Sequence, residues 1–234
     1  MTESVIAATK ALVFDYGGTL DTGGCHWGKV LWHVYEQEGV PVTEEHFREA
    51  YVYAERKLGS ERIIQNDFTF YQTLSEKLRI ELDELHCLSY HEKVLECVYE
   101  QVRFHTQQSR ETLLCLKKHY PIALVSNFYG NLSVVLKEFC LSDLFDAVIE
   151  SALVGVRKPD PKIFAMGVEA LGLSPGEVTV VGDSIEKDIL PAKSAGCSTI
   201  WFRGEQWTDV PIDETVPDGI IDNIKELNKI YEAN

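Results

Sequence analysis

The residues of this chain that could do chemistry are short polar groups that directly follow apolar runs. The first lies in "VFDYGGTLDT", where Asp15 ends an apolar strand and a glycine turn follows at once. The other groups follow later apolar runs and comprise Ser126, Asn127, Lys158, Asp183 and Asp188. An aspartate at the end of a strand is presented at the edge of a sheet, where its carboxylate can act as a nucleophile or bind a cation.

These polar groups belong to a part of the chain in which strands and helices alternate. Strands are predicted for the apolar runs "KALVFD", "PIALVSN", "DAVIES", "VTVVGD" and "STIWF", with helical spacing between them and a last helix near residues 224–230. This alternation predicts an α/β fold with a Rossmann-like, doubly wound parallel sheet. Because parallel strands end at the same edge of a sheet, we expect the polar groups to meet in one crevice there.

A helical segment interrupts the alternation after the first strand. Apolar residues recur at helical spacing over about eighty residues, beginning with Val30, Leu31 and Val34, and no strand-like pattern intervenes. We therefore expect an α/β core made of residues 1–21 and 107–234 and an inserted helical-bundle cap made of residues 22–106. The cap is expected to move as a lid on two hinges, residues 21–24 ("DTGG") and residues 104–108.

Composition narrows the class of protein and of partner. The 234 residues are 45% hydrophobic and 25% charged, and the formal net charge is −15. This charge argues against a nucleic-acid partner, which would require basic patches.

No apolar run approaches the roughly 18 residues of a membrane span, and "MTESVIAATK" lacks the features of a secretory signal. The six cysteines form no C-x-x-C pair, so we expect reduced cysteines and a cytoplasmic protein without a membrane partner.

The order of the polar groups resembles the pattern of the haloacid dehalogenase-like (HAD) hydrolase superfamily over nearly the whole chain. That pattern is D-x-D-G-T, then a strand ending in Ser or Thr, then a lysine, then an acidic pair after another strand. Here the corresponding segments are "DYGGTL", "VSN", "RKP" and "GDSIEKD". The helical segment between the first two resembles the family's cap of the first type.

The resemblance implies a role for each residue that would contact the phosphoryl group of a substrate. Asp15 would attack phosphorus and form an aspartyl-phosphate. Ser126 and the backbone around Asn127 would hold the phosphoryl oxygens, and Lys158 would neutralise the phosphate and the nucleophile. The substrate would be a small phosphorylated metabolite.

The resemblance also implies a Mg²⁺ site. Asp15 and Asp183 would bind the metal together with the backbone carbonyl of Gly17, because Mg²⁺ prefers oxygen ligands. Asp188 would lie behind these ligands and orient Lys158 or the water molecules on the metal.

One position departs from the family pattern, since Gly17 replaces the second aspartate of D-x-D. That aspartate is the general acid and base of the family's phosphatases, and positioned acid–base catalysis contributes about 10²- to 10⁴-fold. Asp21 or His26 could replace it, whereas strand alternation is expected to point Tyr16 away from the nucleophile. We therefore predict a Mg²⁺-dependent hydrolase whose phosphatase activity is weak or atypical.

Three other interpretations stay open for a chain without this aspartate. A carbon–phosphorus hydrolase resembling the family's phosphonoacetaldehyde hydrolases would need a Schiff-base lysine, for which Lys57 is the candidate. A true haloacid dehalogenase needs no metal, and Asp183 argues against it. A protein that binds a phosphorylated ligand without catalysis could use the same residues. The sequence specifies neither the substrate nor the oligomeric state.

Overall fold

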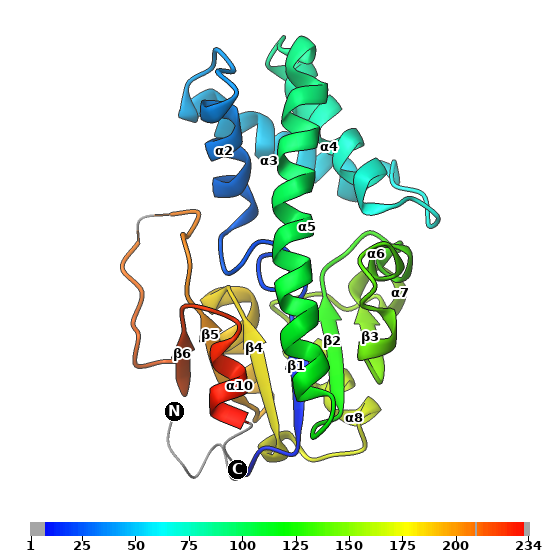
Figure 1. The fold of residues 1–234 in the computed structure, drawn as a ribbon, viewed down its shortest axis with the longest axis vertical. Coiled ribbons are helices and arrows are strands. Elements are labelled where there is room, and N and C mark those ends of the chain that lie inside the picture. Colours follow the sequence, from blue (N-terminus) through cyan, green and yellow to red (C-terminus); the bar gives the residue numbers. More distant parts are fainter. Residues whose placement is uncertain (1–7, 209, 232–234) are drawn as a thin grey trace.

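The computed structural model describes residues 8–208 and 210–231, and its centre is a six-stranded parallel sheet. The strands are β1 (Ala11–Phe14), β2 (Ile122–Ser126), β3 (Ala147–Glu150), β4 (Val178–Gly182), β5 (Ser198–Phe202) and β6 (Gly219–Ile221). Their order in the sheet is β3-β2-β1-β4-β5-β6, so β1 lies between β2 and β4. The predicted α/β fold with a doubly wound parallel sheet is thereby confirmed (Figure 1).

Strand β1 shows why this sheet is covered on both faces. All of its side chains are buried, and they alternate between two cores: Leu12 and Phe14 belong to one, Ala11 and Val13 to the other. The first core includes residues of α5 (His91–Leu116) and α10 (Glu226–Tyr231), and the second includes residues of α8 (Lys162–Ala170) and α9 (Leu190–Ser194). A strand buried on both faces is a continuous apolar run, as "ALVF" is.

The sequence pattern missed two short elements. Strand β6 has three residues, "GII", and α7 (Ser151–Val154) is a single turn after β3. Both are too short to show a hydrophobic period. The remaining helix of this part, α6 (Leu132–Glu138), follows β2 as expected.

The segment between β1 and β2 is helical, as predicted, and forms a helical block of α2 (Trp27–Gln37), α3 (Glu44–Glu61), α4 (Phe70–Glu84) and α5. Thr43 and Thr69 accept hydrogen bonds from the first turns of α3 and α4, so each helix begins at a side-chain cap. In Figure 1, α2, α3 and α4 lie beyond the carboxyl ends of the strands, and α5 runs from them down along the sheet. Since α5 continues through residue 107 without a break, the division of the chain into core and cap stays a prediction.

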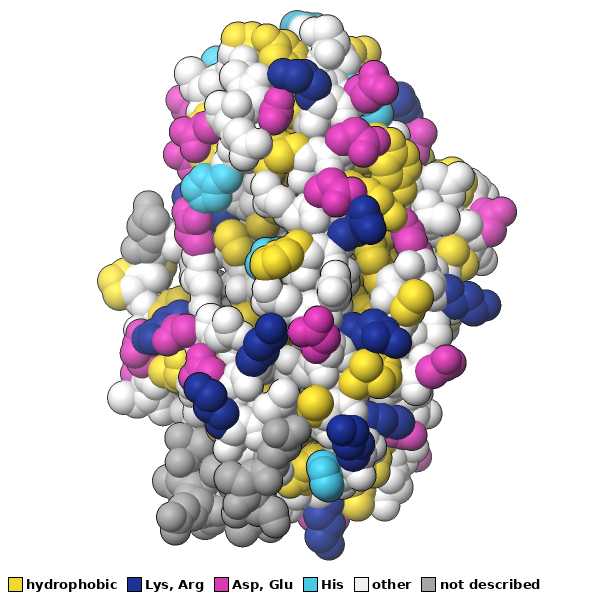
Figure 2. All heavy atoms as spheres, in the orientation of Figure 1, with side chains coloured by type: hydrophobic (Ala, Val, Ile, Leu, Met, Phe, Trp, Pro, Cys, Tyr) yellow, Lys and Arg dark blue, Asp and Glu magenta, His cyan; other side chains and the backbone are white. Residues whose placement is uncertain are grey.

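The exterior of the molecule is mixed in charge. On the face shown in Figure 2, lysine and arginine side chains gather mainly over the α/β part, and acidic ones are frequent over the helical block. Within the described ranges, none of the helices combines the length and the apolar character needed to span a bilayer.

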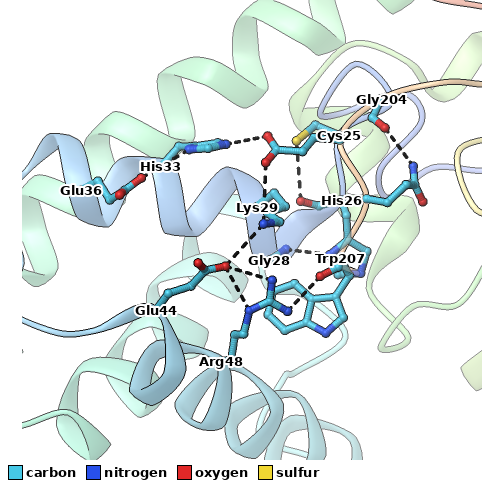
Figure 3. A network of polar contacts seen from close by, with 12 residues as sticks. Cys25, His26, Gly28, Lys29, His33, Glu36, Glu44, Arg48, Gly204 and Trp207 are labelled. Atoms are coloured by element: carbon cyan, nitrogen blue, oxygen red, sulfur yellow. Dashed lines mark hydrogen bonds and ion pairs between the residues drawn. The ribbon is translucent and has the colours of Figure 1, made fainter. Parts of the chain in front are cut away.

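The segment after β5 contacts the helical block through Glu205 and Trp207, and we call the contacts of these two residues the clasp (Figure 3). Arg48 in α3 donates to the carbonyl oxygen of Trp207 at 2.8 Å, and its guanidinium lies 4.2 Å from the centre of the indole ring. Glu205 pairs with His33 at 2.6 Å and with Lys29 at 3.7 Å, both in α2. The clasp therefore joins the carboxyl side of the sheet to two helices that are distant in sequence.

Trp207 fits into the clasp because position 28 is glycine. A Cβ atom at Gly28 would collide with the six-membered ring of Trp207. The indole also contacts the rings of Tyr51 and His26, with centroid distances of 4.9 and 5.2 Å. The ring thus packs against both α3 and the start of α2.

Replacing Trp207 by alanine is expected to lower the free energy of unfolding by about 1–2 kcal/mol, because the aromatic contacts and their buried area are lost. Urea denaturation measures this change through the transition midpoint. Val210, exposed in the same segment, supplies the control, since Val210→Ala should shift the stability by less than about 0.5 kcal/mol. Equal midpoints for the two variants would contradict a stabilising clasp.

Candidate active site

Three carboxylates and one lysine meet beyond the ends of β1 and β4. Phe14 and Val181 are register partners in these neighbouring strands, so Asp15, one residue past Phe14, and Asp183, two residues past Val181, both lie just beyond the ends of the strands. Ligand oxygens of Asp15, Asp183 and Asp188 all lie within 4.8 Å of one another. Lys158 completes the group, since its Nζ atom forms ion pairs with Oδ1 of Asp15 and, at 2.7 Å, with Oδ1 of Asp188.

Burial makes the charges of this group strongly interdependent. Burial raises the pKa of Asp15 to about 6, against the lowering effect of Lys158. The pKa of Asp183 is raised well above its usual value by burial and then by the charges of Asp188 and Asp15. Although burial lowers the pKa of Lys158, the two neighbouring carboxylates raise it overall. One ammonium faces three acids, so the site is electrostatically suited to a further cation.

Lys158 is positioned through its backbone by a side chain that follows β2. The Asn127 amide donates to the Lys158 carbonyl oxygen at 3.1 Å, and its Oδ1 atom accepts from the Lys158 amide at 2.9 Å. The side chain of Asn127 therefore fixes the loop that carries Lys158. Its neighbour Ser126 is buried at the end of β2, and both residues line the same cavity.

Thr19 also belongs to the site, although no role was predicted for it from the sequence. Its hydroxyl donates to Oδ1 of Asp183 at 3.1 Å and accepts from the Asp183 amide at 3.0 Å; Oδ2 of Asp15 is 3.4 Å away. Gly18, directly before it, has φ +99°, and a Cβ there would collide with the Asp183 carboxylate. The signal in the sequence was the Gly-Thr that closes the D-x-D-G-T pattern, which falls here on Gly18 and Thr19.

The site forms the floor of a cavity of about 1230 Å³ that the helical block also lines. All of the predicted site residues border it, namely Asp15, Gly17, Ser126, Asn127, Lys158, Asp183 and Asp188. From the helical block, Trp27, Tyr51, Glu55 and Lys77 border the same space. The cavity therefore brings together the ends of the strands and the inner surfaces of α2, α3 and α4.

Of the two candidates for the missing acid, Asp21 lies at the border of this cavity in a fixed orientation. Its Oδ1 atom accepts from the Gly18 amide at 2.7 Å, and its Oδ2 atom accepts from the Trp27 indole at 3.1 Å. Burial raises the pKa of Asp21 to about 8. Its carboxyl group is consequently mostly protonated at neutral pH, and each oxygen retains a further lone-pair direction.

The other candidate, His26, also borders the cavity but is held as a neutral ring. Its Nδ1 atom accepts from the Gly28 amide at 3.0 Å, which caps α2, and burial lowers its pKa to about 4. Tyr16, by contrast, is fully buried, and its hydroxyl has no hydrogen-bond partner in the described part of the chain. Its ring packs edge-on against Phe128, with centroids 5.7 Å apart.

The space at position 17 is bounded by Trp27. A Cβ at Gly17 would lie 3.7 Å from the indole Nε1 atom, which is an ordinary van der Waals contact. The local backbone therefore admits a side chain there.

Lys57 does not reach the site. Its Nζ atom lies 3.4 Å from the Tyr53 hydroxyl, and the residue is not among those that border the cavity. The lysine that the helical block presents to the cavity is Lys77, in α4. Sequence spacing could not distinguish them, because both lie in amphipathic helices.

Comparison with known proteins agrees with this geometry. The family described as haloacid dehalogenase-like hydrolase matches residues 9–196. A glyceraldehyde 3-phosphate phosphatase of Pyrococcus furiosus is 32% identical over 129 residues, and this match spans only about half of each protein, 53% in both cases. A protein of the same name from Methanothermobacter thermautotrophicus is 29% identical over 94% of this chain and 99% of its own. The crystal structure of a HAD phosphatase from Thermococcus onnurineus, 26% identical, covers 95% of this chain and 97% of its own with a TM-score of 0.55.

Removing the Thr19 hydroxyl is expected to destabilise the site, because the buried amide and carboxylate of Asp183 would lose a partner. Thr19→Val should lower the free energy of unfolding by about 1–3 kcal/mol, as measured by urea denaturation. Thr19→Ser keeps the hydroxyl and should recover most of this loss. A serine variant as unstable as the valine variant would show that the threonine methyl group, and not the hydroxyl, matters.

Proposed function

Since the chain belongs to the haloacid dehalogenase-like hydrolase family, we propose that it is a Mg²⁺-dependent phosphatase acting on a small phosphorylated metabolite. The observation that carries the proposal is the contact between the Lys158 ammonium and the Asp15 carboxylate on the floor of the cavity that the helical block also lines. A phosphoryl group placed there would meet a nucleophile and a positive charge together. The phosphatase names of the relatives support the same class of substrate.

In the proposed reaction an oxygen of Asp15 attacks phosphorus while the bond from phosphorus to the leaving-group oxygen breaks. With a pKa of about 6, the carboxylate is mostly ionised at neutral pH. A water molecule then attacks the aspartyl-phosphate, releasing inorganic phosphate and restoring Asp15. Lys158 stabilises the charge on the transferred group, and Ser126 with the backbone at Asn127 binds its oxygens.

The residues present fit a divalent cation. Asp15, Asp183 and the Gly17 carbonyl would hold it. Burial and the neighbouring charges of Asp188 and Asp15 raise the pKa of Asp183, and a cation would offset this clustered negative charge. When bound, Mg²⁺ supplies positive charge that offsets the phosphoryl oxygens and the carboxylates. Asp188 acts through Lys158, to which it is bonded at 2.7 Å.

For the proton that the leaving group needs, Asp21 is the better candidate. A carboxyl group with a pKa of about 8 is protonated at neutral pH and can donate, whereas His26, with a pKa of about 4, carries no acidic proton there. Trp27, from α2, holds Asp21 at the cavity wall. The helical block thus takes part in placing the proposed acid.

The geometry favours this proposal over the other enzymatic interpretations. A Schiff base requires a neutral amine, but Lys57 lies outside the cavity and the pKa of Lys77 is raised by Glu55 and Glu81, against the lowering effect of burial. A haloacid would bring its own carboxylate beside three others. A protein that binds a phosphorylated ligand without catalysis would use the same floor residues. Measured turnover distinguishes a phosphatase from such a protein.

Turnover should need both Asp15 and a divalent metal. Hydrolysis of an aryl phosphate and of a panel of phosphorylated metabolites, followed by phosphate release, is expected to fall by about 10⁴-fold or more in Asp15→Asn. Excess EDTA should abolish it, and Mg²⁺ should restore it. The control is Asp143→Asn, at an exposed aspartate, which should keep full activity. Unchanged turnover in the Asp15 variant would refute the mechanism.

Restoring a carboxylate at position 17 should raise turnover of substrates with poor leaving groups. We expect about 10-fold or more for Gly17→Asp, within the range of positioned acid–base catalysis, and little change for aryl phosphates. Gly17→Asn, of equal size but without an acid, is the matched control. Equal rates for the two variants would mean that Asp21 already supplies the proton and that a carboxylate at position 17 adds nothing to it.

A further inference from the structure

The cavity has a second charged group, opposite the floor and made by the helical block. Lys77 in α4 borders the cavity with a side chain that is 9% exposed, and it forms an ion pair with Glu55 in α3. Glu81, one turn further along α4, lies 3.9 Å from Lys77 and is completely buried. We call Glu55, Lys77 and Glu81 the roof cluster.

Hydrogen bonds within the roof cluster leave spare donors but few spare acceptors. Both oxygens of Glu55 are occupied, one by Lys77 and the other by the Tyr129 hydroxyl at 3.2 Å. The Lys77 ammonium has three N–H groups, and Glu55 is its one hydrogen-bond acceptor among the described residues. Two further neighbours of the ammonium are the Tyr51 ring, 4.2 Å away, and an oxygen of Glu81 that is 3.9 Å away, beyond hydrogen-bond distance.

Stability alone does not account for this arrangement. A buried ion pair is often no more stable than apolar side chains of similar volume, and one buried oxygen of Glu81 has no hydrogen-bond partner in the described ranges. The two glutamates instead keep the ammonium charged at the edge of a space large enough for a ligand. A buried charge with unused donors at a cavity wall is typical of a binding site.

The roof cluster and the floor are joined by one loop. Asn127 binds the backbone of Lys158 in the floor, and Tyr129, two residues later, binds Glu55 in the roof cluster. Further along the same loop, Asn131 donates to the Phe68 carbonyl and to the Thr73 hydroxyl, at 2.9 and 2.8 Å. A ligand with one end at Asp15 would therefore have its other end in a fixed relation to Lys77.

We propose that Lys77, held by Glu55 and Glu81, binds an oxygen acceptor on the leaving group of the substrate and so determines specificity. The substrate is then a phosphomonoester of a short molecule that carries a carboxylate, carbonyl or hydroxyl oxygen, rather than an apolar or aryl ester. This inference rests on the proposed phosphatase function and adds the class of leaving group to it.

The test compares esters of similar size that differ in polarity: phosphoglycolate, glycerol 3-phosphate and ethyl phosphate. Lys77→Met removes the ammonium and keeps the volume. We expect kcat/KM for the first two esters to fall about 10- to 100-fold, the value of a charge-assisted hydrogen bond, mainly through KM. Ethyl phosphate should change less than about 3-fold. Lys57→Met, outside the cavity, is the matched control and should leave all three unchanged.

Two further measurements keep the inference separate from the phosphatase proposal. Calorimetric Kd values for the same esters with Asp15→Asn, with and without Lys77→Met, report recognition without turnover. If Lys77→Met does not fold, Glu55→Gln replaces it, because this variant keeps the shape and should also raise KM for the polar esters alone. A uniform loss over all three esters, or no loss, would overturn the inference. Absent turnover with intact discrimination in Kd would overturn only the phosphatase proposal.

Discussion

The ion pair of Lys158 with Asp15 and Asp188 is the interaction on which the site depends. Three carboxylates cannot stay ionised together in a buried place unless positive charge accompanies them. Lys158 supplies part of that charge, and its own position depends on the Asn127 amide, which binds both backbone groups of the lysine. The excess of acid over base suits the floor to a cation, and in the proposed function this cation and Lys158 together offset the negative charge of the phosphoryl group.

The helical block lines the other side of the cavity above this floor. Without α2, α3 and α4 the ends of the strands would face solvent, where a single lysine attracts phosphate only weakly at a net charge of −15. Two sets of contacts hold the block over the site: the clasp on the side of β5, and the loop after β2, where Tyr129 and Asn131 bind α3 and α4. Each set joins residues that are far apart in the chain.

In the proposed mechanism Asp21 donates the proton that the family's aspartate at position 17 would supply. Beside Gly17 lies the indole of Trp27, which donates to Asp21 and fixes its orientation at the cavity wall. Burial then keeps Asp21 protonated. An acid built in this way depends on the helical block, since Trp27 is the first residue of α2.

The sequence by itself determined five of the six strands and the residues that end them, because a buried strand is a local apolar run and a parallel sheet brings such ends to one edge. This was enough to place Asp15, Lys158 and Asp183 together, and to identify the segment between β1 and β2 as helical. Three features were decided by the tertiary structure alone. Lys77 and not Lys57 borders the cavity, the Thr19 hydroxyl forms hydrogen bonds with Asp183, and Trp207 packs against α3. The contacts of Thr19 and Trp207 join residues that lie far apart in the sequence. The choice of Lys77 depends on how packed helices are rotated, which a hydrophobic period does not record.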